Sequence, residues 1–165
     1  MNITVKNAMP ADIPEILNVV NHAILYSTAN YNYEPQTLEE QTTWFRTKME
    51  KGNPVLCAYD QDSFAGFATY GTFREKSGYQ FTAEHSVYVA PGMEGKGIGT
   101  ILMKELIEIA RDHKIHCLIG GVDAENKESL RFHERLGFVE CGKIKQAAWK
   151  FDKWLDLLFV QLILD

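Results

Sequence analysis

The sequence predicts a single α+β domain built on a mixed sheet, and three observations lead to this prediction. Short apolar runs with the period-two alternation of strands are interspersed with longer segments whose apolar residues repeat at helical spacing. One strand–helix–strand succession, from 80 to 122, has the order of a parallel unit. The other strands follow one another as antiparallel strands do. The 165 residues, 45% of them hydrophobic, suit one domain with its own core over 1–165.

The first half of the chain is expected to hold two helices and four strands. Pro10 and Pro14 bracket the start of the first helix, where proline is tolerated. Thr37 and Glu40 have the spacing of a capping box, and Gly52 ends the helix that they open. The expected strands cover 2–8, 55–59, 64–71 and 80–90, and the expected helices cover about 10–25 and 38–51.

The second half is expected to alternate helices and strands. The segment 115–122 is almost continuously apolar, which indicates a strand buried on both faces. Asn126 caps the helix that follows it, and Gly137 ends that helix. Two antiparallel strands, 139–146 and 154–164, are joined through 147–153. The helix before the buried strand is expected to turn these residues inward: Ile98, Ile101, Leu102, Leu106, Ile109 and Ala110.

Composition excludes several classes of protein. The net charge of −5 argues against a nucleic-acid binder, which normally shows a basic face. The three cysteines lie far apart in apolar runs and are expected to be buried reduced thiols. No apolar run approaches the roughly 20 residues of a membrane span, and the first seven residues lack the core of a signal peptide. We therefore expect a cytoplasmic protein.

A glycine-rich turn between residues 90 and 100 organises the chain. Gly95, Gly97 and Gly99 come directly after a strand and open an amphipathic helix. Glycines let the backbone approach a ligand closely, and the unpaired N–H groups of a helix N-terminus attract anions. The spacing is neither that of a P-loop nor that of a dinucleotide-binding turn. From this pattern alone, a phosphate site and a tight connection without a ligand both stay open.

The spacing of this turn resembles a known coenzyme-binding loop. Glu94-Gly95-Lys96-Gly97-Ile98-Gly99 is similar to the coenzyme A loop of the GNAT superfamily of N-acetyltransferases, usually written Gln/Arg-x-x-Gly-x-Gly/Ala. The chain departs from that pattern at Glu94, and we expect this carboxylate to face solvent because it would otherwise repel a pyrophosphate. The resemblance implies that acetyl-CoA is the co-substrate and that it is bound by Gly95, Lys96, Gly97, Ile98, Gly99 and Thr100.

The likeness extends over nearly the whole chain, and it implies the GNAT fold, a mixed and mostly antiparallel sheet flanked by helices. Asn126-x-x-Ser129, followed by a helix that ends in Leu-Gly137-Phe, is similar to the second GNAT signature. Thr82-Ala-Glu84-x-Ser86 and Trp154-Leu-Asp156 resemble the phosphinothricin acetyltransferase branch. That branch acetylates the α-amino group of phosphinothricin, methionine sulfoximine or methionine sulfone.

Glu84 is the first catalytic residue that we predict. Strand alternation places it on the face opposite to Ala83 and His85. A carboxylate in a central strand is costly to bury, so the pattern leaves open a solvated side chain and a functional one. The resemblance implies that Glu84 is the general base, acting on the amine directly or through a water molecule.

His133 is the second catalytic residue that we predict. Asn126, Ser129 and His133 form a polar stripe at i, i+3 and i+7 of an apolar helix. Many GNAT enzymes have a tyrosine at the His133 position that protonates the coenzyme thiolate, whereas the phosphinothricin branch has histidine there. An imidazole suits an acid or a proton path. The alternative is a histidine that only hydrogen-bonds the pantetheine or a backbone carbonyl.

The resemblance also implies the binding residues. Asn126 and Ser129 would contact the coenzyme, and the backbone at Val87, Tyr88 and Val89 would pair with the pantetheine and stabilise the oxyanion. Arg74 is the best-placed cation for a substrate carboxylate, although a solvated surface arginine is an equal alternative. The pocket is expected to involve Asn30, Tyr31 and Tyr79, which the sequence does not distinguish from packing residues.

The sequence thus predicts an acetyl-CoA-dependent N-acetyltransferase for a small amino-acid analogue. Two alternatives stay open, namely an acetyltransferase for another amine (a peptide N-terminus, a polyamine or an aminoglycoside) and a non-catalytic sensor of acyl-CoA. A homodimer through the aromatic-rich C-terminal strands is a further hypothesis from the branch. We expect no metal site, because His113, His116 and Cys117 lack a fourth ligand at a matching spacing.

Overall fold

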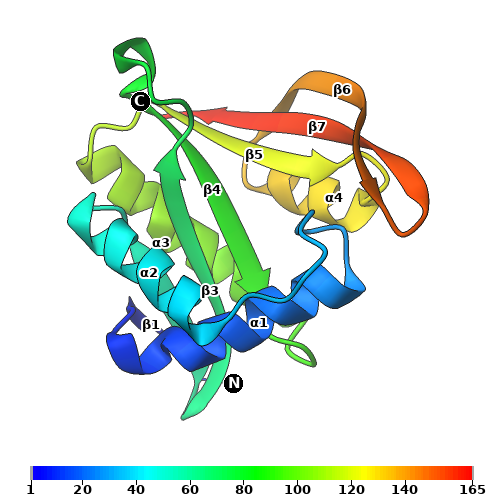
Figure 1. Ribbon diagram of the computed structural model, residues 1–165. Coiled ribbons are helices and arrows are strands. Elements are labelled where there is room, and N and C mark those ends of the chain that lie inside the picture. Colours follow the sequence, from blue (N-terminus) through cyan, green and yellow to red (C-terminus); the bar gives the residue numbers. More distant parts are fainter. Residues whose placement is uncertain (1, 165) are drawn as a thin grey trace.

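A computed structural model describes residues 2–164, and it has the predicted succession of helices and strands (Figure 1). The strands are β1 (Ile3–Asn7), β2 (Val55–Asp60), β3 (Ser63–Thr72), β4 (Thr82–Val89), β5 (Cys117–Asp123), β6 (Val139–Lys150) and β7 (Lys153–Ile163). The α-helices are α1 (Ile13–Tyr26), α2 (Leu38–Glu50), α3 (Ile98–Asp112) and α4 (Lys127–Arg135). Short 3-10 turns cover Pro10–Asp12 and Ser77–Tyr79.

The seven strands form one mixed sheet in the order β1-β2-β3-β4-β5-β7-β6. All neighbouring strands are antiparallel except β4 and β5, which are parallel and are joined by α3 as the crossover helix. The prediction of a mixed, mostly antiparallel sheet flanked by helices is therefore confirmed.

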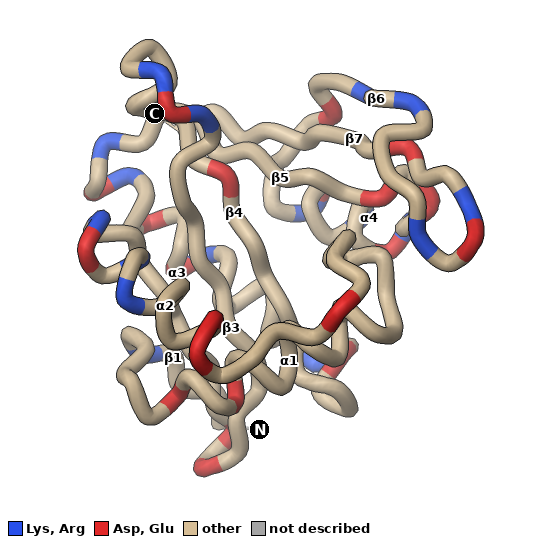
Figure 2. Tube along the Cα trace, in the orientation of Figure 1, with Lys and Arg blue, Asp and Glu red and all other residues tan. Residues whose placement is uncertain are grey.

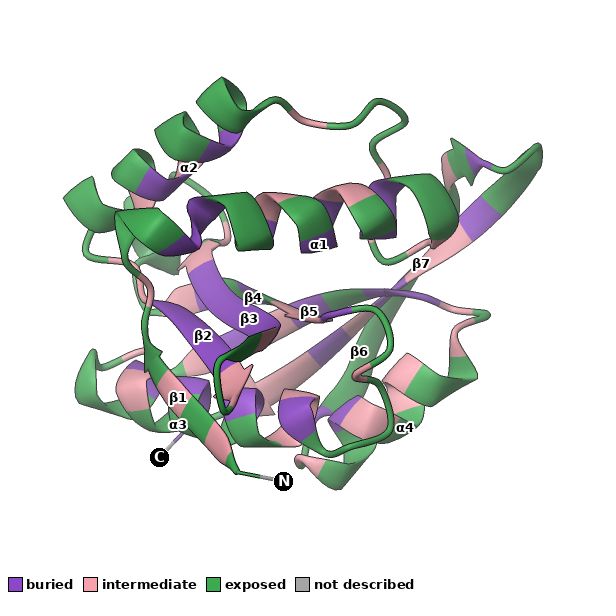
Figure 3. Cartoon of the chain, turned by 90° about the horizontal axis from the view of Figure 1, so that it is seen from below, coloured by how far each residue is buried: buried purple, intermediate pink, exposed green. Residues whose placement is uncertain are grey.

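The helices cover the sheet from both sides. In Figure 3, α1 and α2 lie on one face of the sheet, and α3 and α4 lie on the other. Each pair closes its own core, because Ile16, Ile24 and Phe45 pack on one face while Leu102 and Leu106 pack on the other. The strands between them bury small and branched residues on both faces, which fixes the register of the central strands.

Three sequence expectations were wrong in detail. β6 runs on to Lys150, and β6 and β7 are joined by only two residues, Phe151 and Asp152, both with positive φ. That two-residue turn carries none of the Asn-Gly or Asp-Gly signals of such hairpins, so the loop predicted over 147–153 was too long. Ile101 is 37% exposed rather than inward, and Cys141 is an exposed thiol at a surface strand rather than a buried one.

The outer surface shows mixed charge. Acidic and basic residues are interspersed along the loops and helices of the described chain (Figure 2). Within residues 2–164, no helix has the length and apolar character that crossing a membrane requires.

Candidate active site

The centre of the sheet opens where β4 and β5 separate. These two strands pair only over Thr82–Glu84 and Cys117–Ile119, although both continue beyond that point. A cavity fills the gap between them. It is lined by β4, β5, α4 and the segment after α1, through Thr28, Ala29, His85, Ser86, Val87, Tyr88, Gly120, Gly121, Val122, Asp123, Asn126, Ser129 and His133. Beyond Glu84, the edge of β4 that faces this gap has no strand partner within residues 2–164, so its backbone groups are free to pair with a ligand.

Glu84 lies at the point where the two strands part, on the face of the sheet opposite to His85. Its side chain is exposed and is not among the cavity-lining groups. Partial burial nevertheless raises the pKa of its carboxyl above the ordinary value. A Cβ built on Gly121 would lie 3.6 Å from Glu84 Oε1, so the absence of a side chain at Gly121 leaves room for the carboxylate. This placement leaves Glu84 open to a substrate on the α1 side of the sheet.

The polar stripe of α4 lines the cavity on the other side. The side chain of Asn126 caps the helix by accepting a hydrogen bond from the Ser129 amide at 3.0 Å. His133 Nδ1 lies 2.7 Å from the Ser129 carbonyl oxygen and 3.5 Å from Ser129 Oγ. Burial lowers the pKa of the His133 imidazole. The structure thus brings the three predicted residues together on one wall of the cavity.

His85 is a site residue that the sequence reasoning missed. Its Nε2 atom lies 2.9 Å from His133 Nε2, and its Nδ1 lies 2.9 Å from the carbonyl oxygen of Ile119. Strand alternation had placed His85 correctly on the buried face, beside Ala83. A histidine on an otherwise apolar face was the signal that could have drawn attention to it.

The glycine turn has backbone angles that favour glycine. Gly95 and Gly97 have positive φ angles of 73° and 78°, and Gly97 is the N-cap of α3. A Cβ at Gly99 would meet Phe132 of α4 at 3.3 Å, so glycine permits the close packing of α3 against α4. Glu94 is exposed, as expected, and accepts a hydrogen bond from the Gly92 amide at 2.7 Å. The turn therefore leaves the N-terminus of α3 clear of the carboxylate.

The predicted substrate residues fall into two groups. Arg74 and Tyr79 lie in the loop before β4, where the ring of Phe73 packs on Tyr79 and on Phe159 of β7. Phe159 is the strand partner of Gly121, so this group lies on the Glu84 face near the point of separation. The Arg74 guanidinium is exposed and stacks over the Phe73 ring at 5.4 Å.

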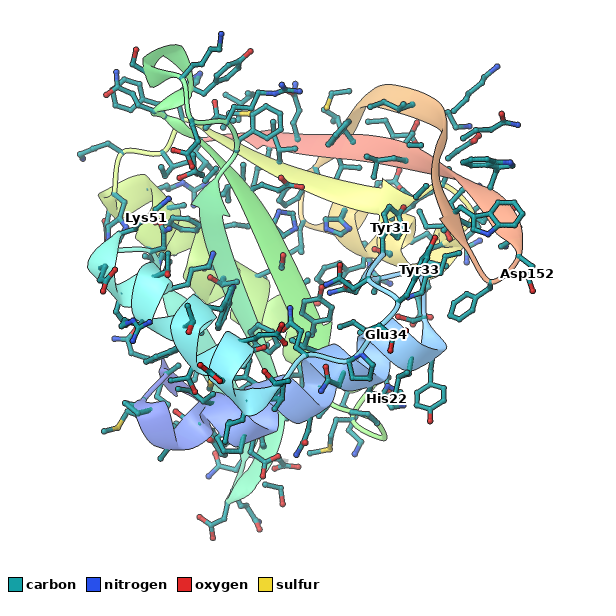
Figure 4. The ribbon with its side chains drawn as sticks, viewed as in Figure 1. His22, Tyr31, Tyr33, Glu34, Lys51 and Asp152 are labelled. Carbon is teal, nitrogen blue, oxygen red and sulfur yellow. The ribbon has the colours of Figure 1, made fainter. Side chains whose placement is uncertain are left out.

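The second group lies on the segment after α1. Tyr31 and Tyr33 extend from this segment on the side of the molecule that carries β6 and β7 (Figure 4). The Tyr31 hydroxyl is buried with no hydrogen-bond partner in the described part of the chain, and burial, together with the charge of Asp123, raises its pKa. Asp123 also accepts a hydrogen bond from Thr28 at 2.7 Å. Asn30 is partly buried on the same segment, and Val89, at the end of β4, is the one predicted coenzyme-binding strand residue that does not line the cavity.

Comparison with known proteins identifies the family. The model of the acetyltransferase (GNAT) family matches residues 19–138. The chain belongs to the GNAT family of acetyltransferases. This confirms the resemblance on which the coenzyme loop and the α4 signature were interpreted.

Similar proteins point to one branch of that family. The chain is 40% identical to the L-methionine sulfoximine/L-methionine sulfone acetyltransferase of Pseudomonas aeruginosa, over 100% of this chain and 96% of the relative. It is 38% identical to the L-amino acid N-acyltransferase MnaT of Escherichia coli, over 99% and 95%. The crystal structure of yncA from Salmonella typhimurium with its cofactor acetyl-CoA superposes with a TM-score of 0.96 at 36% identity, over 99% of this chain and 94% of that one. The GNAT member described here is therefore an acyltransferase homologous to amino-acid N-acyltransferases.

Proposed function

We propose that this protein transfers the acetyl group of acetyl-CoA to the α-amino group of a small amino acid such as methionine sulfoximine, methionine sulfone or phosphinothricin. The observation that carries the proposal is the gap between β4 and β5, with Glu84 on one face of its closed end and His133 on the other side. The names of the similar proteins support the choice of substrate class.

The two sides of the gap suit the two halves of the reaction. Glu84 takes the proton of the amine, directly or through a water molecule, while the thioester lies in the gap along the unpaired edge of β4. A backbone N–H of that edge, between Val87 and Val89, stabilises the negative charge on the thioester oxygen. His133, at the buried side, serves the departing sulfur. Gly95 to Thr100 hold the pyrophosphate at the N-terminus of α3, and Lys96 adds a positive charge there.

The substrate residues supply orientation. Arg74 binds the carboxylate of the amino acid, in the same loop as Tyr79 and on the same face as Glu84. Asn30 and Tyr31, on the segment after α1, are the other residues that we assign to the amino acid. The Tyr31 hydroxyl has no hydrogen-bond partner among residues 2–164, and we assign it as a donor to an oxygen of the tetrahedral sulfur or phosphorus.

Release of free thiol from acetyl-CoA, measured across a panel of amines, tests the proposed function. We expect saturable turnover with methionine sulfoximine, methionine sulfone or phosphinothricin, and slower turnover with ordinary amino acids, spermidine and an aminoglycoside. Fast turnover confined to spermidine or to the aminoglycoside would show that the substrate is a polyamine or an aminoglycoside and not an amino acid. Tight binding of acetyl-CoA without turnover of any amine would indicate a sensor instead.

The pH dependence of kcat/KM is expected to report Glu84. Burial raises the pKa of its carboxyl, so a larger fraction is protonated in mildly acidic solution than for an exposed glutamate. Because the ionised form is the base, kcat/KM should fall as the pH decreases through this raised pKa. The measurement is a pH–rate profile below neutrality at saturating acetyl-CoA. An activity that stays constant down to the pKa of an ordinary glutamate would contradict the assignment.

A homodimer through the C-terminal hairpin is also proposed. β6 and β7 expose Ile144, Trp149 and Trp154, with Phe151 at the turn between them. Exposed apolar groups of this size on one hairpin favour burial against a second copy. Sedimentation at micromolar concentration should give the mass of two chains, and Trp154→Glu should give the mass of one. A single-chain mass for the unaltered protein would refute the dimer.

A further inference from the structure

The buried side of the cavity holds two imidazoles that belong to different elements. His85, on β4, and His133, on α4, are exposed by only 6% and 5%. Their Nε2 atoms lie 2.9 Å apart. Each Nδ1 faces a backbone carbonyl oxygen, that of Ile119 at 2.9 Å for His85 and that of Ser129 at 2.7 Å for His133. The two rings therefore form a chain of three contacts between two carbonyl groups.

This series of three contacts requires three protons. A carbonyl oxygen only accepts, so each Nδ1 needs a proton to donate, and the contact between the two Nε2 atoms needs a third. Two neutral imidazoles carry two ring protons. The neutral pair is thus one proton short, and one of the three contacts lacks its hydrogen. With a proton between the two Nε2 atoms, that contact is one of the two between Nδ1 and a carbonyl. On the His133 side, the Ser129 hydroxyl, 3.5 Å from Nδ1, is placed to donate to the bare nitrogen.

The environment of the two imidazole rings determines whether the pair holds a third proton. Burial lowers the pKa of His85 to about 3 and lowers the pKa of His133, so the resting pair is neutral at pH 7. The groups packed around the rings are uncharged, namely Gly120 of β5, Phe132 of α4 and Phe138. In the described chain, the ionisable group whose charge acts on His85 is His133 itself. A negative charge that develops in the adjoining cavity would favour uptake of the third proton.

We propose that His85 is a positioning residue which joins His133 in a two-imidazole unit that takes up one proton and gives it to the departing sulfur, with both rings fixed in place. The proposal rests on the proposed function for the destination of the proton. As the N–C bond forms, the amine loses one proton to Glu84. The neutral pair takes its third proton from water in the adjoining cavity as negative charge develops on the thioester. As the C–S bond breaks, the pair gives this proton to the sulfur and returns to the two-proton state. Glu84 afterwards releases the amine proton to water, so the proton taken from water and the proton returned to it cancel and no further reactant is required.

The geometry of the pair is testable without activity. In protein labelled with ¹⁵N-histidine, NMR should show a ¹⁵N–¹⁵N coupling through the hydrogen bond between the two Nε2 atoms at pH 7. It should also show two ring protons for the neutral pair. Two uncoupled rings would overturn the proposal even if the enzyme acetylates amino acids. A coupled pair in a protein that turns over no amine would instead refute the proposed function.

Substitution of His85 tests its role in turnover. His85→Gln keeps a hydrogen-bonding group near the position of Nε2 but cannot take up a proton. We expect kcat to fall by about 10- to 100-fold, with the KM for acetyl-CoA unchanged within about twofold and the shape of the pH–kcat profile altered. His85→Phe should lower kcat at least as far. His116→Gln, at an exposed histidine, is the matched control and should match the unaltered protein.

The outcomes separate a proton-holding role from a purely structural one. If His85→Gln has the kcat and the pH profile of the unaltered protein, a fixed hydrogen bond to His133 is sufficient and the proposal is wrong. Thermal melting and binding of acetyl-CoA show whether each variant folds. If His85→Phe does not fold, His85→Gln and the coupling measurement on the unaltered protein still decide the question.

Discussion

Glu84→Gln is expected to lower kcat for acetyl transfer by about 10²- to 10⁴-fold, because it removes the proposed general base while it keeps the shape of the side chain. The carboxylate lies at the point where β4 and β5 part and does not line the cavity proposed for the coenzyme. Binding of acetyl-CoA, measured by calorimetry, should therefore change by no more than about twofold. Glu108→Gln, at an exposed glutamate paired with Arg111 on α3, is the control and should retain full activity.

The stability of the same variant distinguishes loss of chemistry from loss of fold. Partial burial raises the folded-state pKa of Glu84 above its unfolded value, so the folded protein disfavours the ionised form. Its contribution to stability is present at low pH and is lost as the pH rises through the folded pKa. At neutral pH, Gln removes that penalty, and Glu84→Gln should melt at or above the temperature of the unaltered protein. An inactive variant that melts lower would contradict a purely catalytic role.

The faces of β4 could be predicted from alternation alone. The period-two pattern placed Glu84 and His85 on opposite sides, and the structure keeps them so, one exposed and one buried. The parallel pairing of β4 with β5 also followed from the strand–helix–strand order. These features are local, because they depend only on the spacing of residues within one element or one connection.

The separation of β4 from β5 could not be predicted in this way. It depends on where the pairing stops, after Glu84 and Ile119, and the spacing of residues within one element does not give that point. Gly120 and Gly121 were the available signal. A Cβ at Gly120 would lie 2.5 Å from His85 Cε1, and one at Gly121 would lie 3.2 Å from Leu157 Cδ1. Two glycines in a buried strand indicate a close approach on each face, but not what approaches.

The contact between His85 and His133 also could not be predicted from the sequence. The two residues are 48 positions apart and belong to a strand and a helix that meet only in the folded chain. Alternation and helical spacing each gave the right face for one partner. Neither pattern gives the distance between two elements, so the pair had to be found in the structure.

Lys150 is a buried cation whose role also emerged only from the structure. It is 4% exposed, at the end of β6, and its ammonium donates to the carbonyl oxygens of Ile24, Ser27 and Asn30 at 2.6, 2.7 and 2.5 Å. All three donors of the ammonium are used. These carbonyls lie at the C-terminus of α1 and just beyond it, where helix carbonyls lack partners and the dipole favours a positive charge.

Lys150→Met is expected to lower the free energy of unfolding by about 3 kcal/mol, because the three carbonyl groups lose a charged donor while the aliphatic stem is kept. Denaturant unfolding measures the change. Lys143→Met, at a half-exposed lysine on the same strand that pairs with Asp156 at 3.8 Å, should change it by no more than about 0.5 kcal/mol. Equal stability of the two variants would show that the buried ammonium adds nothing.

The effect of Lys150→Met should reach the proposed substrate pocket. Lys150 holds the segment after α1 in place through its hydrogen bonds, and this segment contains Asn30 and Tyr31. Thr28 in the same segment donates a hydrogen bond to Asp123 on β5. Once the segment loosens, the KM for the amino acid should rise, whereas the KM for acetyl-CoA should change little, because Gly95–Thr100 lie elsewhere in the fold. A rise in both constants together would indicate general unfolding. A rise in the first alone would tie Asn30 and Tyr31 to the acceptor.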